Sequence, residues 1–136
     1  MWGGFDLSAT RYRAVAVDPP AGRPVFQQNG MAEEVVALGF ALPDKESPDA
    51  CFYGYIAPEP PGVAERHWAL EQASWQPEAG LAVLPWDAAR RARDPRNAVI
   101  SFADAVYDAA VSLAGWPAHL TGTRVDGWTA SRQRIS

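Results

Sequence analysis

Apolar and polar residues alternate along the first part of the chain, as they do in a β-strand that buries one of its faces. The segment 2–17 follows this period of two. One face carries Phe5, Leu7 and Ala9, and the other carries Asp6, Ser8 and Thr10. The prolines of the segment 18–24 then end the strand, because proline fixes φ and has no backbone N–H to donate.

Three later runs also predict strands, at residues 33–42, 50–57 and 80–86. The run at 50–57 is rich in aromatic residues, which suits a pleated, half-buried surface. Residues 63–80 follow no regular period. We expect this segment to be a long loop or a short helix held to the domain by its large apolar side chains, Trp68, Leu70 and Trp75.

The clearest element is a helix over residues 95–114. Asp94 is a good N-cap acceptor, and Pro95 suits the first helical position. Apolar residues then recur at steps of three and four, which gives one buried stripe. The stripe consists of Val99, Phe102, Val106, Ala110 and Leu113. Gly115 and Pro117 end the helix, and a shorter helical turn is expected before it, at residues 87–93.

These elements predict an α+β fold: an antiparallel sheet of about four strands with one long C-terminal amphipathic helix packed on one face. The strands are expected to be antiparallel because the connections between them hold no crossover helix. We expect a single domain over residues 1–116 and a polar tail over residues 117–136.

Composition excludes several classes of protein. An apolar content of 48% and a net charge of −4 do not fit intrinsic disorder, and the acidic balance gives no basic stripe for nucleic acid. No run approaches the roughly 18 apolar residues of a membrane span, and the N-terminus does not read as a secretory signal. We therefore expect a cytoplasmic protein. Lys45 is the only lysine among 12 basic residues, a bias that suggests a GC-rich bacterial gene.

Candidate chemistry is sparse. The single cysteine, Cys51, excludes an internal disulfide, and His67 and His119 lie too far apart in sequence to predict a zinc site. We therefore expect neither a metal nor a cofactor. The polar face of the first strand, next to Arg11, either faces solvent or lines a polar cleft. Tyr53 and Tyr55 share one face of the third strand. They either line the same cleft or pack in the core or at the edge of the sheet.

Five stretches of the chain occur in the order found in one bacterial family. They are WGGFDLSATRY, EEVVALGF, FYGYIAPEPPG, LAVLPWDAARRARDP and VYDAAVSLAGW. From Trp2 to about Trp116 the chain therefore resembles the uncharacterised family called domain of unknown function 5996. Members of that family are roughly twice as long, and the resemblance implies that this chain corresponds to their second half.

The resemblance also bears on chemistry and partners. Histidines are common at two places in the family: one would precede the first residue here, and Glu33 stands at the other. If those histidines serve catalysis or a metal, this chain has neither. A lone half would expose the surface that its mate covers, so the resemblance implies self-association or a partner chain.

We expect a binding or interaction module that uses its sheet face to hold a second copy, a partner chain or a small molecule. Its expected lining is Asp6, Thr10, Arg11, Tyr53 and Tyr55. The alternative is an enzyme of unknown reaction, with His67 as a further candidate and a site lined by Asp6, Arg11, Glu34 and Tyr55. A third hypothesis is a degenerate relative with a structural role. An enzyme should show a deep pocket where ionisable groups converge, and a module a shallow face.

Overall fold

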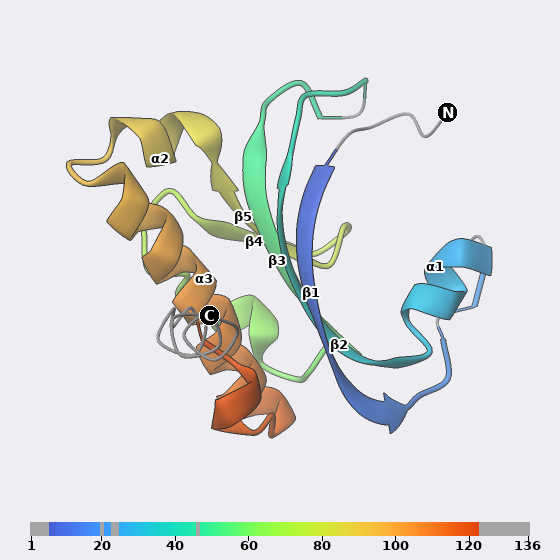
Figure 1. Ribbon diagram of the computed structural model, residues 1–136. Coiled ribbons are helices and arrows are strands. Elements are labelled where there is room, and N and C mark those ends of the chain that lie inside the picture. The colour runs from blue at the N-terminus through green and yellow to red at the C-terminus, as the bar shows by residue number, and fades with distance from the viewer. Residues whose placement is uncertain (1–5, 20, 23–24, 46, 123–136) are drawn as a thin grey trace, which may run out of the picture.

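In the computed structural model, which describes residues 6–19, 21–22, 25–45 and 47–122, a long helix crosses one face of an antiparallel sheet (Figure 1). The strands are β1 (Asp6–Ala16), β2 (Glu33–Ala41), β3 (Cys51–Ala57), β4 (Ser74–Gln76) and β5 (Leu81–Pro85). The α-helices are α1 (Val25–Gly30), α2 (Trp86–Arg91) and α3 (Pro95–Ala114), and two 3-10 turns are η1 (Val63–Glu65) and η2 (Ala118–Leu120).

The sheet has the order β1-β2-β3-β5-β4, and every neighbouring pair is antiparallel. The predicted α+β class is confirmed, but the sheet has five strands where the sequence predicts about four. The additional strand, β4, lies in the segment 63–80, which the sequence predicts as a loop or a short helix. Three residues are too few to show the alternation that identifies a strand.

The remaining strands agree with the prediction to within a residue or two. β1 begins at Asp6, and residues 1–5 of the predicted strand lie outside the described part of the chain. α1 follows the proline-rich segment and is not predicted, because six residues cannot carry a helical stripe. In Figure 1, α1 lies beyond one end of β1 and β2, on the side of the sheet away from α3.

The long helix is confirmed at both ends. A side-chain oxygen of Asp94 accepts a hydrogen bond from the backbone N–H of Asn97 at 3.0 Å, and Gly115 ends the helix with φ 68°. The predicted stripe is buried against the sheet at Phe102, Val106 and Ala110. The sheet residues in the same core cluster include Val36, Ile56, Ala82 and Leu84.

One glycine sets how closely α3 approaches the sheet. A Cβ built on Gly54 of β3 would lie 2.7 Å from Cγ2 of Val106, which is closer than side chains allow. The helix therefore packs directly on the backbone of the central strand. This contact lies at the middle strand of the sheet.

Strand alternation gives the sheet two different faces. The helix face is the one under α3. The open face lies opposite, and in the three strands β1 to β3 it carries Asp6, Ser8, Thr10, Tyr12, Val35, Ala37, Gly39, Ala41, Cys51, Tyr53, Tyr55 and Ala57. Val35 and Ala37 are nevertheless fully buried. Ala37 lies between the larger residues Thr10 and Tyr55.

Candidate functional site

Three rows of residues cross the open face from β1 through β2 to β3. In each row a polar side chain on β1 lies opposite a small residue on β2. That small residue in turn lies opposite a tyrosine or a cysteine on β3. The rows are Thr10–Ala37–Tyr55, Ser8–Gly39–Tyr53 and Asp6–Ala41–Cys51. The middle strand therefore has only small side chains between the polar side chains of β1 and the side chains of β3.

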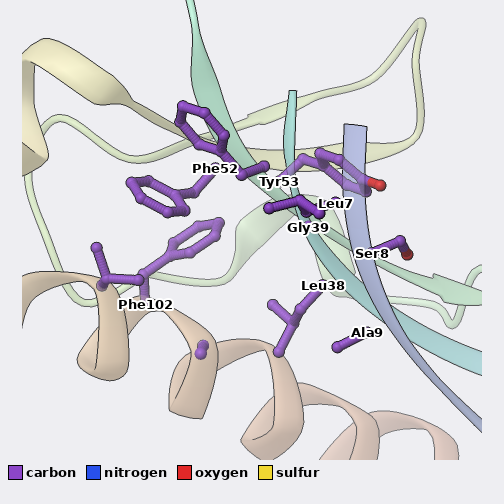
Figure 2. A pocket seen from close by; sticks show the side chains of 11 residues that line it. Leu7, Ser8, Ala9, Leu38, Gly39, Phe52, Tyr53 and Phe102 are labelled. Atoms are coloured by element: carbon purple, nitrogen blue, oxygen red, sulfur yellow. The ribbon is translucent and has the colours of Figure 1, made fainter. Parts of the chain in front are cut away.

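The side chain of Tyr53 occupies the space above Gly39. A Cβ there would lie 2.4 Å from the ring of Tyr53 and 2.5 Å from the backbone oxygen of Leu7. Only glycine leaves room for the tyrosine ring to lie across β2 toward β1. Figure 2 shows the ring beside Gly39, with its hydroxyl reaching past β1 on the side to which Ser8 points.

The Tyr53 hydroxyl donates a hydrogen bond to Oδ2 of Asp6. Burial, followed by the hydrogen bond to Asp6, raises the pKa of Tyr53 to about 12, although a hydrogen bond with Ser8 acts in the opposite direction. The phenol therefore stays protonated at neutral pH and acts as a donor. A tyrosine held in this state is suited to binding and poorly suited to removing a proton.

The structure brings together four of the five residues predicted to line the sheet face: Asp6, Thr10, Tyr53 and Tyr55. Thr10 extends the polar row, with its Oγ1 3.2 Å from Oγ of Ser8. Asp6 and Thr10 are exposed, and the two tyrosines are half-buried.

Arg11 does not belong to this group, although the sequence predicts it to line the same sheet face. As an odd-numbered residue of β1 it points to the helix face, where its guanidinium lies 4.5 Å from the centre of the Tyr107 ring. Its Nη1 and Nη2 donate to the backbone oxygens of Leu120 and Gly122 at 2.8 and 2.9 Å. Arg11 therefore ties the start of the segment 117–136 to β1, and residues 123–136 lie outside the described chain.

Glu34 is also on the helix face, so the four residues of the alternative enzyme site are divided between the two sides of the sheet. Glu34 forms an ion pair with Arg13 at 3.1 Å. Arg13 also donates to the backbone oxygen of Ala114, in the last turn of α3. His67 is exposed in the connection between η1 and β4, apart from either group.

Two broad hollows adjoin on the open face, toward β5. One, of about 1190 Å³, has Cys51, Tyr53 and Val83 in its lining, and loop residues on both sides wall it. The other, of about 560 Å³, includes Tyr55. Both include Ala79 and Leu81, so the two hollows form one continuous trough, which we call the open-face trough.

Carboxylates surround the open-face trough. Asp49, Glu78 and Asp87 line the larger hollow, and Asp18 and Glu59 line the smaller one. Asp87 is partly neutralised, because it pairs with Arg90 at 2.6 Å. The other four form no ion pair within the part of the chain that the structure describes, and no lysine or arginine is among the described residues lining either hollow.

Sequence reasoning misses these four acids, because each stands in a different loop or turn. The signal available to it is compositional. The connections at residues 43–49, 58–62 and 77–79 carry acidic residues and prolines, and the first of them contains the single lysine. Only the sheet order shows that these connections border one face.

A third hollow lies on the helix face, beside β1. This apolar groove, of about 350 Å³, runs between α3 and the outer strands. Figure 2 shows its lining: Leu7 and Ala9 approach from β1, Leu38 from β2, Phe52 from β3 and Phe102 from α3. Leu7 is 64% exposed, which is unusual for a leucine that borders a core.

Two further features of the described residues bear on function. No group of three or more histidine, cysteine, aspartate or glutamate side chains among them is placed to hold a metal ion. None of the helices in the described segments is long and apolar enough to cross a membrane.

The fold and this site define a class: a small α+β domain in which, among the described residues, a helix covers one face of an antiparallel sheet and a trough bordered by carboxylates lies on the other. The chain belongs to the family of unknown function DUF5996, whose family model matches residues 1–123. The match extends past the predicted limit near Trp116. That the chain corresponds to the second half of longer relatives stays a prediction. No curated protein and no solved structure matches the chain.

Proposed function

We propose that this domain is a non-catalytic interaction module, and that its open face binds an extended, positively charged segment of a partner polypeptide. One observation carries the proposal: the open-face trough is bordered by carboxylates, and no described cation lines it. A surface with one sign of charge inside a concave site attracts the opposite charge and raises its local concentration.

The positions of the basic residues are consistent with a negatively charged trough. Arg11 and Arg13 point to the helix face and bind backbone oxygens there. Arg90 and Arg91 lie on α2, where both pair with Asp87. Arg11 and Arg13 are thus engaged on the helix face, and Arg90 and Arg91 are engaged by Asp87 at the border of the trough. The other carboxylates of the border, Asp18, Asp49, Glu59 and Glu78, form no ion pair with a described basic side chain.

Aromatic side chains give the trough a second means of holding a cation. Tyr55 contributes to the smaller hollow and Tyr53 to the larger one. Arginine and lysine side chains bind the faces of such rings while their charged ends reach carboxylates. An extended segment with basic residues at intervals would use both kinds of contact.

The enzyme hypothesis has less support. Its candidate residues do not converge, since Asp6 and Tyr55 lie on the open face and Arg11 and Glu34 lie on the helix face. The trough is broad, and its acids stand around its border. Catalysis requires acid, base and substrate groups within hydrogen-bond reach of one another.

The direct test is the affinity of the protein for a labelled synthetic peptide of alternating arginine and serine, measured by fluorescence anisotropy. We expect binding that weakens as salt is added. The double variant Glu59→Lys/Glu78→Lys should bind about tenfold more weakly, because each exposed charge contributes a fraction of a kcal/mol and both are reversed.

The matched control is Glu65→Lys/Glu71→Lys. It changes the net charge by the same amount at exposed residues that line neither hollow. Its affinity should stay within about twofold of the original protein. Equal losses of peptide affinity in the two double variants would show that the peptide is attracted by net charge and not by a site. An absence of binding at low salt would reject the proposed function.

A further inference from the structure

The two edges of the sheet differ greatly in length. β4, at one edge, has three residues, whereas β1, at the other, has 11. Natural sheets protect their edges with short strands, prolines, lysines or bulges, because an open edge pairs readily with another chain. β1 contains neither proline nor lysine, and no described strand pairs with its outer side (Figure 1).

A bulge limits the open edge to the first part of β1. Asp6–Tyr12 pairs with β2 without interruption, and the register then shifts between Tyr12 and Ala16. Ala14 within the shift has φ 60°, so the strand bends away there. A regular template of seven residues, Asp6 to Tyr12, remains.

We propose that this template pairs with the same segment of a second copy, antiparallel, about a two-fold axis at Ser8. An axis of this kind places the helix faces of both sheets on the same side, and opposite residues then lie on the same face. Ser8 faces Ser8 of the second copy. Leu7 faces Ala9 of the second copy, and Asp6 faces its Thr10.

The pairings in this register are chemically matched on both faces. On the open face, the Thr10 hydroxyl of one copy can donate a hydrogen bond to the Asp6 carboxylate of the other. That carboxylate already accepts a hydrogen bond from Tyr53 of its own copy and has further acceptor sites. On the helix face, Leu7 and Ala9 of both copies form one apolar patch. Cross-strand pairs of like character stabilise a sheet, and mismatched ones do not.

Other axes give poorer pairs. An axis at Ala9 puts Leu7 opposite Arg11, and an axis at Thr10 puts Ala9 opposite the same arginine. An axis at Arg11 places two like charges directly across the seam, which is destabilising. An axis at Leu7 pairs only three described residues. The register at Ser8 pairs Asp6 to Thr10 of both copies and places none of these five residues opposite Arg11.

The apolar groove beside β1 continues the seam. Leu7 and Ala9 border this groove, and the residues behind them are Leu38, Phe52 and Phe102. In the paired state the grooves of the two copies meet on the same side of one continuous sheet. Burial of Leu7, now 64% exposed, gives the second copy an apolar contact in addition to the backbone pairing.

This inference does not depend on the binding of a cationic segment, because the outer edge of β1 and the open-face trough are separate surfaces. The test is oxidative cross-linking of Ser8→Cys in a Cys51→Ser background. Opposite residues of an antiparallel pair have Cα atoms about 4.5–5.5 Å apart, within the range that a disulfide spans. We expect nearly complete conversion to a disulfide-linked dimer.

Thr10→Cys in the same background is the matched control. It lies on the same face and is similarly exposed, but two copies of Thr10 would be roughly 13 Å apart in this register. It should not form a disulfide-linked dimer under the same oxidation. Cross-linking of Thr10→Cys with equal or greater efficiency would overturn the Ser8 register.

Light scattering provides the second measurement. The unmodified protein should have about twice the 14.7 kDa mass of one chain at high micromolar concentration. Leu7→Lys should shift it to a monomer, because the substitution places a charge inside the apolar seam. Val25→Lys, at a residue of α1 that is 71% exposed, should leave the mass unchanged. A monomeric unmodified protein would overturn the proposal.

Discussion

The helix face of the sheet buries Val36, Ile56 and Leu84 under α3, whereas the open face leaves Asp6, Ser8 and Thr10 exposed. Both sets of residues come from strands with the same alternation, in which successive side chains point to opposite faces of the sheet. The difference lies in what each face meets. Within the described part of the chain, the helix face is covered by α3, and connections border the open face.

Polar residues on the helix face are used for structure. Arg11 and Arg13 bind backbone oxygens at and beyond the end of α3, where a helix leaves its last carbonyl groups unpaired. On the open face, the polar residues Asp6, Ser8 and Thr10 are exposed, and their printed side-chain hydrogen bonds join residues of the same face. A charged residue in this protein is therefore a candidate for binding only after its face is known.

The largest expected effect separates the two faces by stability. Phe102→Ala removes a side chain that is 1% exposed and should lower the free energy of unfolding by about 3–5 kcal/mol. Thr10→Ala, on the open face, should change it by less than about 0.5 kcal/mol. Urea unfolding of both variants measures the contrast, and similar losses would contradict the division into a packed face and a binding face.

Arg11→Ala tests the corrected placement of this residue. The loss of two hydrogen bonds from a charged donor should reduce the free energy of unfolding by about 1–2 kcal/mol. Its affinity for the arginine–serine peptide should be unchanged, because the side chain points away from the open-face trough. A stable variant with altered peptide affinity would return Arg11 to the binding surface.

The smallest expected effect is a pH dependence from Tyr53. Its pKa is raised from 10.0 to about 12 in the folded protein, so the folded state holds the proton more tightly. The stability that it contributes is complete below pH 10 and is lost as the pH rises toward 12. Spectroscopic titration of tyrosinate measures this transition.

Asp6→Asn gives the control for that titration, because it replaces the charged acceptor of the Tyr53 hydroxyl. The transition assigned to Tyr53 should move to lower pH. Tyr53→Phe should remove it altogether. A titration curve that is the same with and without the Asp6 carboxylate would disprove the coupling of these two groups.

The sequence predicts the parts of the fold that have a clear period or a clear end. α3 has both, since its stripe is regular and Asp94, Pro95 and Gly115 define its limits, and the structure confirms it from Pro95 to Ala114. β4 and α1 have neither. They are short, and the neighbours that order them are distant in sequence, so propensity alone does not identify them.

The candidate site is predicted in part for a related reason. Alternation places Asp6 and Thr10 on one face of β1 and Arg11 on the other. The prediction that Arg11 lines the same site as Asp6 and Thr10 therefore overlooks the period of the strand. The acids around the trough depend on the sheet order, which brings Glu59 and Glu78 from separate connections to one border. Local patterns do not contain that information.

The most direct test of the central claim is amide chemical-shift mapping by NMR during titration with the arginine–serine peptide. We expect the shifts to cluster at Tyr53, Tyr55, Glu59 and Glu78 on the open face and to saturate as one site. Residues of the apolar groove, such as Phe102, should not move. Shifts that centre on the helix face, or that spread evenly over the surface without saturation, would contradict a binding site on the open face.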